Sequence, residues 1–326
     1  MNNSNALLYV IVFLFTFTLT VLSARLIIPY LKRRAEQPIY EEGPKWHMAK
    51  SGTPTMGGLS FLIAILVALI LSSFYLYICK DEKGAFSILI CAAYALMNAL
   101  IGIIDDLTKL RHKKNAGLTP RAKLILQFTA SSIFLIARMG ILNEGTEIAF
   151  SFGNIDLGIV YYFLSIIILV GITNCANLTD GIDGLATSVA FAIGLSVFYL
   201  SYCRFDSASF ISAALVGATV GFLVFNIHPA KVFMGDTGSL LLGSLVASLA
   251  FELKNPFIAI TTGSVYVIEG VSVILQVAYF KMTKKRLFKM APIHHHLEKC
   301  GWDENKICLT AIAITLLFSV SNLLCL

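Results

Sequence analysis

The sequence predicts an all-α integral membrane protein, a polytopic bundle of about ten transmembrane helices. With 57% hydrophobic and 13% charged residues among 326, the chain has too little polar surface to cover the apolar bulk of a soluble globule. Ten apolar runs of roughly 16 to 26 residues follow one another, where about 20 residues span the hydrocarbon core. Basic residues are also distributed very unevenly among the connecting loops, as expected for a membrane protein of fixed orientation.

The apolar runs define the expected spans. They lie at 6–31, 56–78, 85–104, 121–140, 157–173, 185–203, 209–227, 237–252, 257–280 and 307–325. The first run has no basic segment before it, and its cluster Lys32-Arg33-Arg34 follows it, which predicts an anchor with an external N-terminus and not a cleaved signal. No soluble segment of domain size remains, so we expect residues 1–326 to form a single transmembrane domain.

The loops alternate in basic content. Odd-numbered loops and their edges hold 20 of the 25 Lys and Arg residues, while even-numbered loops and edges hold Lys80, Lys83, Arg138, Arg204 and Lys254. The positive-inside rule therefore places every odd loop in the cytoplasm and both termini outside. The net charge of +6 follows from this bias and suits anionic headgroups, so it does not indicate nucleic acid.

A polar island at 174–185 lies between two of the apolar runs. In it Asn174, Asn177, Asp180 and Asp183 recur at intervals of three, without a basic residue among them. Uncompensated carboxylates beside lipid are costly, so the pattern favours a site that binds a cation or a substrate.

A structural alternative accounts for part of the island. Asp180 and Asp183 fit the N-cap and third positions of the next helix, which would explain the two carboxylates but not the asparagines. Because steps of three rotate by about 60° on a helix, all four side chains cannot share one face. A helix break at Gly181 or Gly184 would turn the second pair back toward the first.

Adjacent carboxylates end the third apolar run. Asp105 and Asp106 are followed by Lys109, Arg121 and Lys123. Neighbouring acids at a membrane boundary repel each other unless a cation or proton intervenes. They are either a solvated helix end or, as the surrounding basic residues favour, part of a site for a phosphate-rich ligand.

The loop before the eighth run contains a further acid, Asp236, between Gly235 and Gly238. It is a candidate metal ligand or a helix N-cap. Phe233, the aromatic residue nearest to it, is expected either to stack on a ligand ring or to pack in the core. His228, which precedes a proline, is interpreted as local structure.

The first cytoplasmic loop ends in a glycine-rich segment, 50–58, that contains Lys50 and Thr55. Such segments let backbone N–H groups approach phosphate, but this one lacks the Walker spacing. A glycine-assisted start of the second span is the alternative.

The last cytoplasmic loop carries His294, His295 and His296 in succession. Successive side chains on a helix diverge by about 100°, so we do not expect the three to bind one zinc ion. Imidazoles that fan out from a loop would instead meet phosphate or sugar oxygens.

Glu269, an acid within the ninth run, is interpreted as a structural partner inside the bundle. The segment 146–157 predicts a small external β-hairpin.

All of these polar groups except the hairpin and Glu269 fall in odd loops or at their edges, hence on one membrane face. A cytoplasmic site with carboxylates, amides and bases suits Mg²⁺-assisted phosphoryl chemistry between a nucleotide substrate and a lipid phosphate. A transporter is the rival class, but transporters place ionisable groups near the midplane and expose them to both faces in turn.

Five segments together resemble the phospho-N-acetylmuramoyl-pentapeptide transferase (MraY) family of the polyprenyl-phosphate N-acetylhexosamine-1-phosphate transferase superfamily, and the resemblance covers nearly the whole chain. They are 52–58, 105–123, 174–186, 232–236 and 291–296. The first and last of them are specific to this family, whereas the aspartate motifs are shared across the superfamily. Val224, Thr237 and the pair Cys175-Ala176 depart from the family pattern without touching a proposed polar ligand.

The resemblance implies transfer of phospho-MurNAc-pentapeptide from UDP-MurNAc-pentapeptide to undecaprenyl phosphate, which gives lipid I and UMP in the first membrane step of peptidoglycan synthesis. It further implies Mg²⁺, a homodimer and an active site on the cytoplasmic face of the bacterial cell membrane. A sibling enzyme that uses another UDP-N-acetylhexosamine remains the nearest alternative.

Individual roles are implied by the same resemblance. Asp236 would bind the metal with Asn177 as a second ligand, and Asp105 and Asp106 would form the acid-base pair near the lipid phosphate. Substrate contacts are implied for Lys50, Thr55, Lys109, Lys123, Asn174, Asn177, Asp180, Asp183, Phe233, His294, His295 and His296. A single displacement and a two-step route through an aspartyl-phosphate both remain open.

Overall fold

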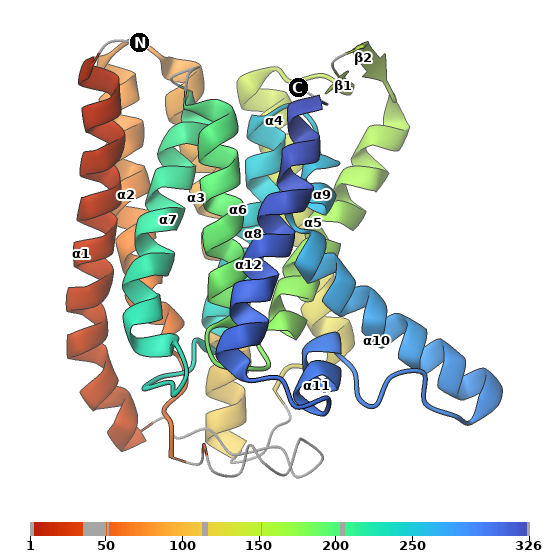
Figure 1. Ribbon diagram of the computed structural model, residues 1–326. Helices are drawn as coiled ribbons and strands as arrows, with labels where there is room; N and C mark the ends of the chain where they lie inside the picture. The colour runs from red at the N-terminus through yellow and green to blue at the C-terminus, as the bar shows by residue number, and fades with distance from the viewer. Residues whose placement is uncertain are drawn as a thin grey trace.

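The computed structural model describes residues 3–34, 50, 52–112, 117–150, 152–202 and 206–324, and it is almost entirely helical (Figure 1). The elements are α1 (Asn3–Arg34), α2 (Gly58–Ile78), α3 (Glu82–His112), α4 (Pro120–Leu142), β1 (Glu147–Phe150), β2 (Gly153–Asp156), α5 (Ile159–Thr179), α6 (Leu185–Ser201), α7 (Ser207–Asn226), α8 (Gly235–Glu252), α9 (Ile258–Thr262), α10 (Ser264–Thr283), α11 (Ile293–Glu298), α12 (Glu304–Val320) and the short 3₁₀ turn η2 (Ser321–Leu324).

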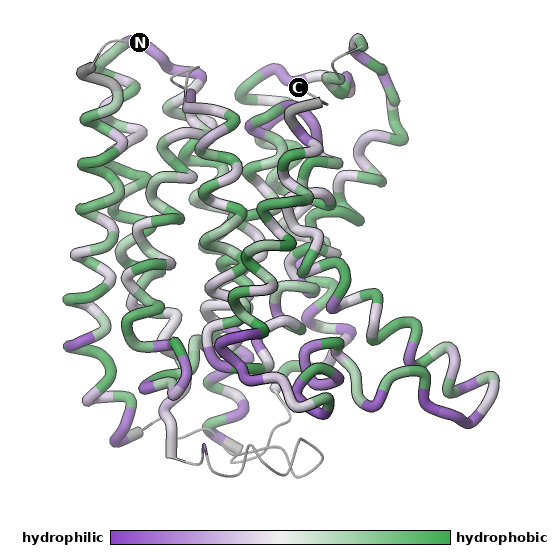
Figure 2. Tube along the Cα trace, viewed as in Figure 1, coloured by the Kyte–Doolittle hydropathy of each residue, from purple (hydrophilic) through white to green (hydrophobic). Residues whose placement is uncertain are grey.

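Every predicted apolar run falls on a helix, so the helical membrane class is confirmed. Within the described residues, seven helices are long and apolar enough to cross a membrane: α1 to α5, α7 and α10. The helices α6, α8 and α12 have 17, 18 and 17 residues. Large apolar side chains such as Leu26, Ile125 and Ile274 remain exposed along the bundle, and Figure 2 shows hydrophobic stretches along the helices with hydrophilic ones gathered near the end that carries α11. Such a surface fits lipid and not water.

Three predicted boundaries were wrong. The third run was expected to end at 104 and the fifth at 173, but α3 continues to His112 and α5 to Thr179. Hydropathy marks only the apolar part of a helix, whereas the backbone hydrogen bonds that define the helix continue into polar sequence. The ninth run is two helices, because α9 ends at Thr262 and Gly263 separates it from α10. Figure 1 shows α10 leaning away from the bundle.

The predicted hairpin is present. Its strands β1 and β2 are antiparallel, with Glu147 opposite Asp156 and Phe150 opposite Gly153. The hairpin lies at the same end of the bundle as the first turns of α1 and the last turns of α12, and α11 lies at the opposite end (Figure 1). The two ends of the molecule therefore carry different sets of polar groups.

Near the hairpin end, a buried arginine joins several helices. Arg138 of α4 is 3% exposed and forms an ion pair with Glu252 at the end of α8. Its Nε and Nη2 also lie 2.6 and 2.7 Å from the two carboxylate oxygens of Glu144. Ser87 of α3 donates to Glu252 at 2.7 Å, and Ser207 of α7 donates to the same carboxylate. This network fixes four helices to one another at one end of the bundle.

We expect Arg138→Met to lower the free energy of unfolding by about 3–5 kcal/mol, because Glu252 would remain buried without its counter-ion. Glu144→Gln should cost less than about 1 kcal/mol, since that side chain is 31% exposed. Unfolding in detergent, followed by the apparent midpoint temperature, measures both. The double variant Arg138→Met, Glu252→Leu should recover part of the loss, and equal effects of the two single variants would contradict a buried ion pair of this strength.

Candidate functional site

Three carboxylates meet at the end of the bundle opposite the hairpin. Asp105 and Asp106 lie near the end of α3, and Asp236 lies in the first turn of α8. One oxygen from each lies within 4.8 Å of the others. Asp105 and Asp106 are each 3% exposed, so the alternative of a solvated helix end is wrong. Carboxylate oxygens at this spacing could hold a metal ion.

Asp106 binds the start of α8. Its Oδ1 accepts the backbone N–H of Asp236 at 3.0 Å, and its Oδ2 accepts the N–H of Thr237 at 2.9 Å and the Thr237 hydroxyl at 2.7 Å. The first N–H groups of a helix have no partner within the helix, and the helix dipole favours an anion there. The residue at the N-cap of α8 is Met234, so the alternative of Asp236 as an N-cap is wrong.

Asp105 has different surroundings, although it is the neighbour of Asp106 in sequence. Its Oδ1 accepts the N–H of Leu118 at 2.9 Å. Its Oδ2 is buried and forms an ion pair with Nζ of Lys109 at 2.7 Å. A Cβ at Gly117 would lie 2.6 Å from this carboxyl. Asp105 is therefore held by one backbone N–H and one lysine, and Lys109 is the partner that a ligand could replace.

Two lysines face Asp236. Lys109 Nζ lies 3.1 Å from its Oδ1, and Lys123 Nζ of α4 lies 2.5 Å from its Oδ2. Asn177 of α5 donates to Asp236 at 3.2 Å and to Ser239 at 2.7 Å, and its Oδ1 accepts from Lys123 at 3.3 Å. Side chains from α3, α4, α5 and α8 thus converge on one acidic group, as the sequence predicted for all of them except Ser239.

Asn174 lies one turn away from this group. Its amide donates to Oε1 of Gln127 at 2.7 Å and to the Val170 carbonyl at 2.8 Å. Nothing in the sequence pointed to Gln127, which lies 47 positions away within an apolar run. Asn174 therefore joins α5 to α4 beside the site.

The polar island is a helix followed by a tight turn. α5 ends at Thr179, and Gly184, with φ of +78°, precedes α6. The predicted break is confirmed, but it does not return both aspartates to the asparagines, because Asp183 pairs with Lys50 and His228 instead. Because α6 begins without a side-chain cap, the alternative of Asp180 and Asp183 as its capping pair is wrong.

Asp180 has no hydrogen bond or ion pair among the described residues. The protein packed around it raises the pKa of its carboxyl well above the ordinary value, and the negative charges of Asp236, Asp106 and Asp183 raise it further. Asp180 therefore has no partner among the described residues and is available to a ligand.

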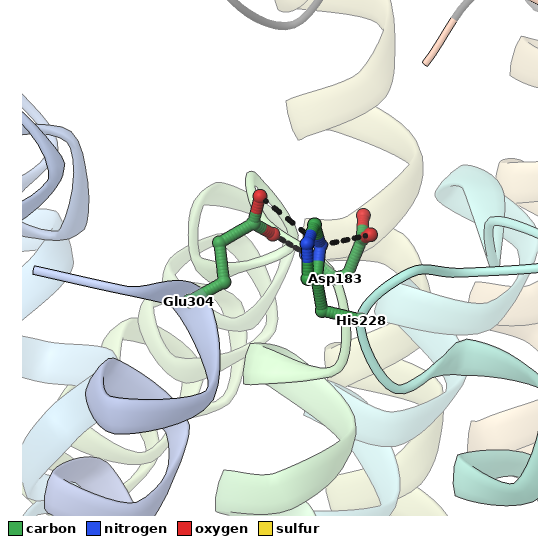
Figure 3. A group of neighbouring side chains, drawn as sticks. All are labelled: Asp183, His228 and Glu304. Carbon is green, nitrogen blue, oxygen red and sulfur yellow. Dashed lines mark hydrogen bonds and ion pairs between the residues drawn. The ribbon is translucent and has the colours of Figure 1, made fainter. Parts of the chain in front are cut away.

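Asp183 belongs to a second cluster (Figure 3), in which Asp183, His228 and Glu304 point toward one another. His228 Nδ1 lies 3.0 Å from Asp183 Oδ2 and 3.4 Å from Glu304 Oε1. Lys50 Nζ lies 2.8 Å from both carboxylates. One nitrogen or oxygen from each residue lies within 4.8 Å of the others, as in a metal site. The Lys50 ammonium, however, already compensates the negative charge of the two carboxylates.

The interpretation of His228 as local structure is wrong, because its partners are distant in sequence. Glu304 was not singled out from the sequence, since it follows the helix N-cap Asp303, where an acid is ordinary. Both line an open pocket of about 280 Å³ together with Glu298, Lys299, Trp302 and Asp303. The contacts of His228 and Glu304 with Asp183 join residues more than 40 positions apart, and a local sequence pattern cannot predict such contacts.

The glycine-rich segment is a helix start and not a free phosphate loop. Gly57 N–H donates to the Phe233 carbonyl at 2.9 Å, Gly58 N–H donates to the Met234 carbonyl at 3.0 Å, and α2 begins at Gly58. These N–H groups are therefore not available to phosphate. Thr55 is 5% exposed beside Gly235, and Phe233 is partly exposed.

The three histidines lie on the short helix α11 and not on the loop that was expected. They diverge as predicted, and each meets a different partner. His294 Nδ1 lies 3.0 Å from Glu269, His295 Nδ1 lies 2.6 Å from Glu298, and His296 Nδ1 accepts the N–H of Lys289 at 3.1 Å. The His294 ring contacts Gly181 in the turn after α5, so α11 borders the site.

Comparison with known proteins gives a consistent picture. The model of the family described as glycosyl transferase family 4 matches residues 85–254, and a phospho-N-acetylmuramoyl-pentapeptide-transferase signature matches residues 50–62. These two stretches contain Asp105, Asp106, Asp236 and the glycine-rich segment.

Similar proteins come from several bacteria, and each bears the name phospho-N-acetylmuramoyl-pentapeptide-transferase. The protein of Halalkalibacterium halodurans is 44% identical over 309 residues, which cover 94% of this chain and 93% of the relative. That of Bacillus subtilis is 42% identical over 93% of each chain. That of Clostridium acetobutylicum is 41% identical over 93% of this chain and 94% of the relative.

The close approach of α3 and α8 gives a test of the site's geometry. A Cβ at Gly102 would lie 2.3 Å from the Asp236 carbonyl oxygen, whereas nothing lies within 4 Å of a Cβ at Gly140. We expect Gly102→Ala to lower the free energy of unfolding by about 1–3 kcal/mol through overpacking. Gly140→Ala on α4 should be neutral or stabilise by up to about 1 kcal/mol. Matched thermal melts in one detergent measure both, and a Gly102→Ala protein as stable as Gly140→Ala would mean that the two helices are not held this closely.

Proposed function

Because the chain belongs to the phospho-N-acetylmuramoyl-pentapeptide-transferase family, we propose that the acidic group at the ends of α3 and α8 is its active site. The enzyme transfers phospho-MurNAc-pentapeptide from UDP-MurNAc-pentapeptide to undecaprenyl phosphate and releases UMP. The observation that supports the location is the convergence of three carboxylates, whose oxygens lie within 4.8 Å of one another, and of two lysines that form ion pairs with Asp105 and Asp236. A transfer assay with UDP-N-acetylglucosamine as competitor tests the sugar, because a sibling enzyme would use the competitor and this one would not.

The orientation in the membrane follows from the basic loops. We propose ten spans in one transmembrane catalytic domain, with both termini and the hairpin outside and the site on the cytoplasmic face of the bacterial cell membrane. In support, the site lies at the end of the bundle opposite the hairpin. Both substrates are compatible with this placement, since one is a soluble nucleotide and the other a membrane lipid. We also propose a homodimer, as the family resemblance implies.

Labelling of single cysteines tests this orientation once the native cysteines are replaced. Lys285→Cys should react with a membrane-impermeant maleimide only after the cells are opened, and Asn154→Cys should react in intact cells. Labelling of Lys285→Cys from outside would reverse the orientation and place the site on the external face.

The residues of the acidic group fit Mg²⁺. Three carboxylates face only two lysines, and Asp236 with the amide oxygen of Asn177 would offer oxygen donors when Lys109 and Lys123 turn to the substrate. Such oxygen donors are the ligands that Mg²⁺ prefers. We propose Asp236 as the protein's main ligand with Asn177 as the second. When bound, the ion would neutralise charge on the diphosphate.

The chain's own residues would do the rest of the chemistry. We propose that Asp105 receives the proton of the undecaprenyl phosphate, since Asp106 already accepts three hydrogen bonds at the start of α8. Lys109 and Lys123 are 23% and 14% exposed and can exchange Asp236 for the phosphate oxygens of the donor. Electrostatic stabilisation of this kind is the main requirement of phosphoryl transfer.

The remaining predicted contacts surround this group, and we propose them as the nucleotide side of the site. Asp180 is without a partner, Phe233 keeps part of its ring exposed for stacking on uracil, and Asp183 with Lys50 lies at the turn after α5. The other proposed substrate contacts are Thr55, Asn174, Asn177, His294, His295 and His296. In this arrangement the loops recognise the nucleotide and the helix ends hold the reacting phosphates.

Removal of the metal ligand is a direct test. We expect Asp236→Asn to lower lipid I formation by at least about 100-fold and to weaken the dependence of the rate on added Mg²⁺, while the protein still folds because Asp236 is not in the core. Wild-type activity in the variant, or full activity of the wild type in EDTA, would contradict the metal role.

The paired aspartates should respond differently to pH. A base that acts on undecaprenyl phosphate is needed only until that phosphate loses its second proton, at a pKa near 6 for a phosphate monoester. The rate of Asp105→Asn relative to wild type should therefore rise from about pH 5 to about pH 7, as the acceptor titrates through this pKa and the fraction that still needs a base falls. Asp106→Asn should show a flat ratio, because its loss disturbs the start of α8. A flat ratio for Asp105→Asn, in protein that melts as wild type does, would favour a nucleophilic or purely electrostatic Asp105.

A further inference from the structure

A buried glutamate outside the acidic group contacts one of the three histidines. Glu269 of α10 is 2% exposed. Its Oε2 lies 3.0 Å from Nδ1 of His294 and 3.3 Å from the backbone nitrogen of the same residue. No lysine or arginine pairs with it in the part of the chain that the structure describes. Both contacts therefore hold a single residue of α11, one through its ring and one through its backbone.

These contacts favour one tautomer of the imidazole. A carboxylate can only accept, so a hydrogen on Nδ1 of His294 matches its contact with Glu269. The ring is fully buried, and its Nε2 has no hydrogen-bond partner among the described residues. Buried N–H groups without an acceptor are rare, so the tautomer with an unprotonated Nε2 fits the geometry best.

The free nitrogen is directed at the polar island. A Cβ at Gly181 would lie 2.2 Å from His294 Nε2 and 2.7 Å from Cε1, so the ring edge lies directly against the backbone between Asp180 and Ile182. Gly181 itself is partly exposed. A small shift of this turn would open Nε2 to a ligand bound beside Asp180.

We propose that Glu269 is a positioning residue for the nucleotide substrate, acting through His294, and that Nε2 accepts a hydrogen bond from the uridine portion. The inference rests on the proposed function of the site. The donor is the uracil N3–H or a ribose hydroxyl, because a lone pair repels the phosphate oxygens that the sequence had suggested as partners of the histidines. Binding of the nucleotide and the position of the turn at Gly181 are thereby coupled.

Nitrogen NMR of protein labelled with ¹⁵N-histidine tests the protonation state. The chain has six histidines, and the spectrum of His294→Gln identifies the signal that belongs to this one. We expect a hydrogen on Nδ1 and a lone pair on Nε2 in the wild type, and a change at Nε2 on addition of UMP. In Glu269→Ala the preference for this tautomer should disappear. An Nε2–H tautomer or an imidazolium in the wild type would overturn the proposal without any variant.

Binding of donor-deleted nucleotides tests the positioning role. UMP, N3-methyl-UMP, 2′-deoxy-UMP and 3′-deoxy-UMP are titrated into wild type and Glu269→Ala by calorimetry. One of the analogues should bind the wild type about 10-fold more weakly than UMP, the loss of one hydrogen bond of roughly 1.4 kcal/mol. That penalty should vanish in Glu269→Ala. In the transfer assay, the variant should raise KM for the UDP substrate several-fold with little change in kcat.

Matched variants keep the outcome interpretable. Glu269→Gln retains an acceptor for Nδ1–H and should restore most of the binding, which a loss of packing would not predict. Glu147→Gln, at an exposed glutamate of the hairpin, should leave every readout unchanged. Analogue penalties that are the same in wild type and Glu269→Ala would reject the positioning role, whereas a wild type that binds no UMP at all would reject the proposed function itself.

Discussion

The hydrogen bonds between the Asp106 carboxylate and the start of α8 determine the position of the other acidic residues of the site. Both oxygens of this carboxylate bind backbone N–H groups of Asp236 and Thr237, so α8 begins where α3 ends. Asp236, in the first turn, is thereby placed beside Asp105. The contact requires close backbones, and Gly102 supplies one: a side chain there would meet the Asp236 carbonyl. The acidic group is thus a consequence of how two helices are joined.

Charged groups are buried at both ends of the bundle, but for different purposes. At the hairpin end, the Arg138 side chain is 4% exposed and that of Glu252 2%, and their hydrogen bonds are satisfied within the protein. At the other end, Lys109 and Lys123 remain partly exposed and share carboxylates that outnumber them. A closed ion pair holds the helices in one arrangement, because the loss of either partner alone leaves a buried charge uncompensated. In the acidic group the lysines are partly exposed and fewer than the carboxylates, so a lysine can leave its carboxylate and bind a ligand.

The sequence predicted the elements that local chemistry determines. Apolar runs located the membrane helices, and a break at Gly181 or Gly184 was expected between Asn177 and the next helix, where α5 ends at Thr179 and α6 begins after Gly184. The sequence could not predict which polar residues pair across the fold. Glu304 lies 121 residues from Asp183, and the Glu304 carboxylate accepts the Asp183 N–H. Successive side chains on a helix point about 100° apart, so Asp105 and Asp106 were expected to differ, but α8, which binds only Asp106, lies 130 residues later.

The division of the site into helix ends and loops separates two sets of contacts. Asp105 and Asp106 lie on α3, and the backbone N–H groups at the start of α8 bind Asp106. Two of the segments that carry the family resemblance, 52–58 and 291–296, lie beside this group. The first pairs its backbone with Phe233, and the second sets His294 against Gly181. Changes in these loops can therefore alter the surroundings of the carboxylates without moving them, because the two sets of residues depend on different contacts.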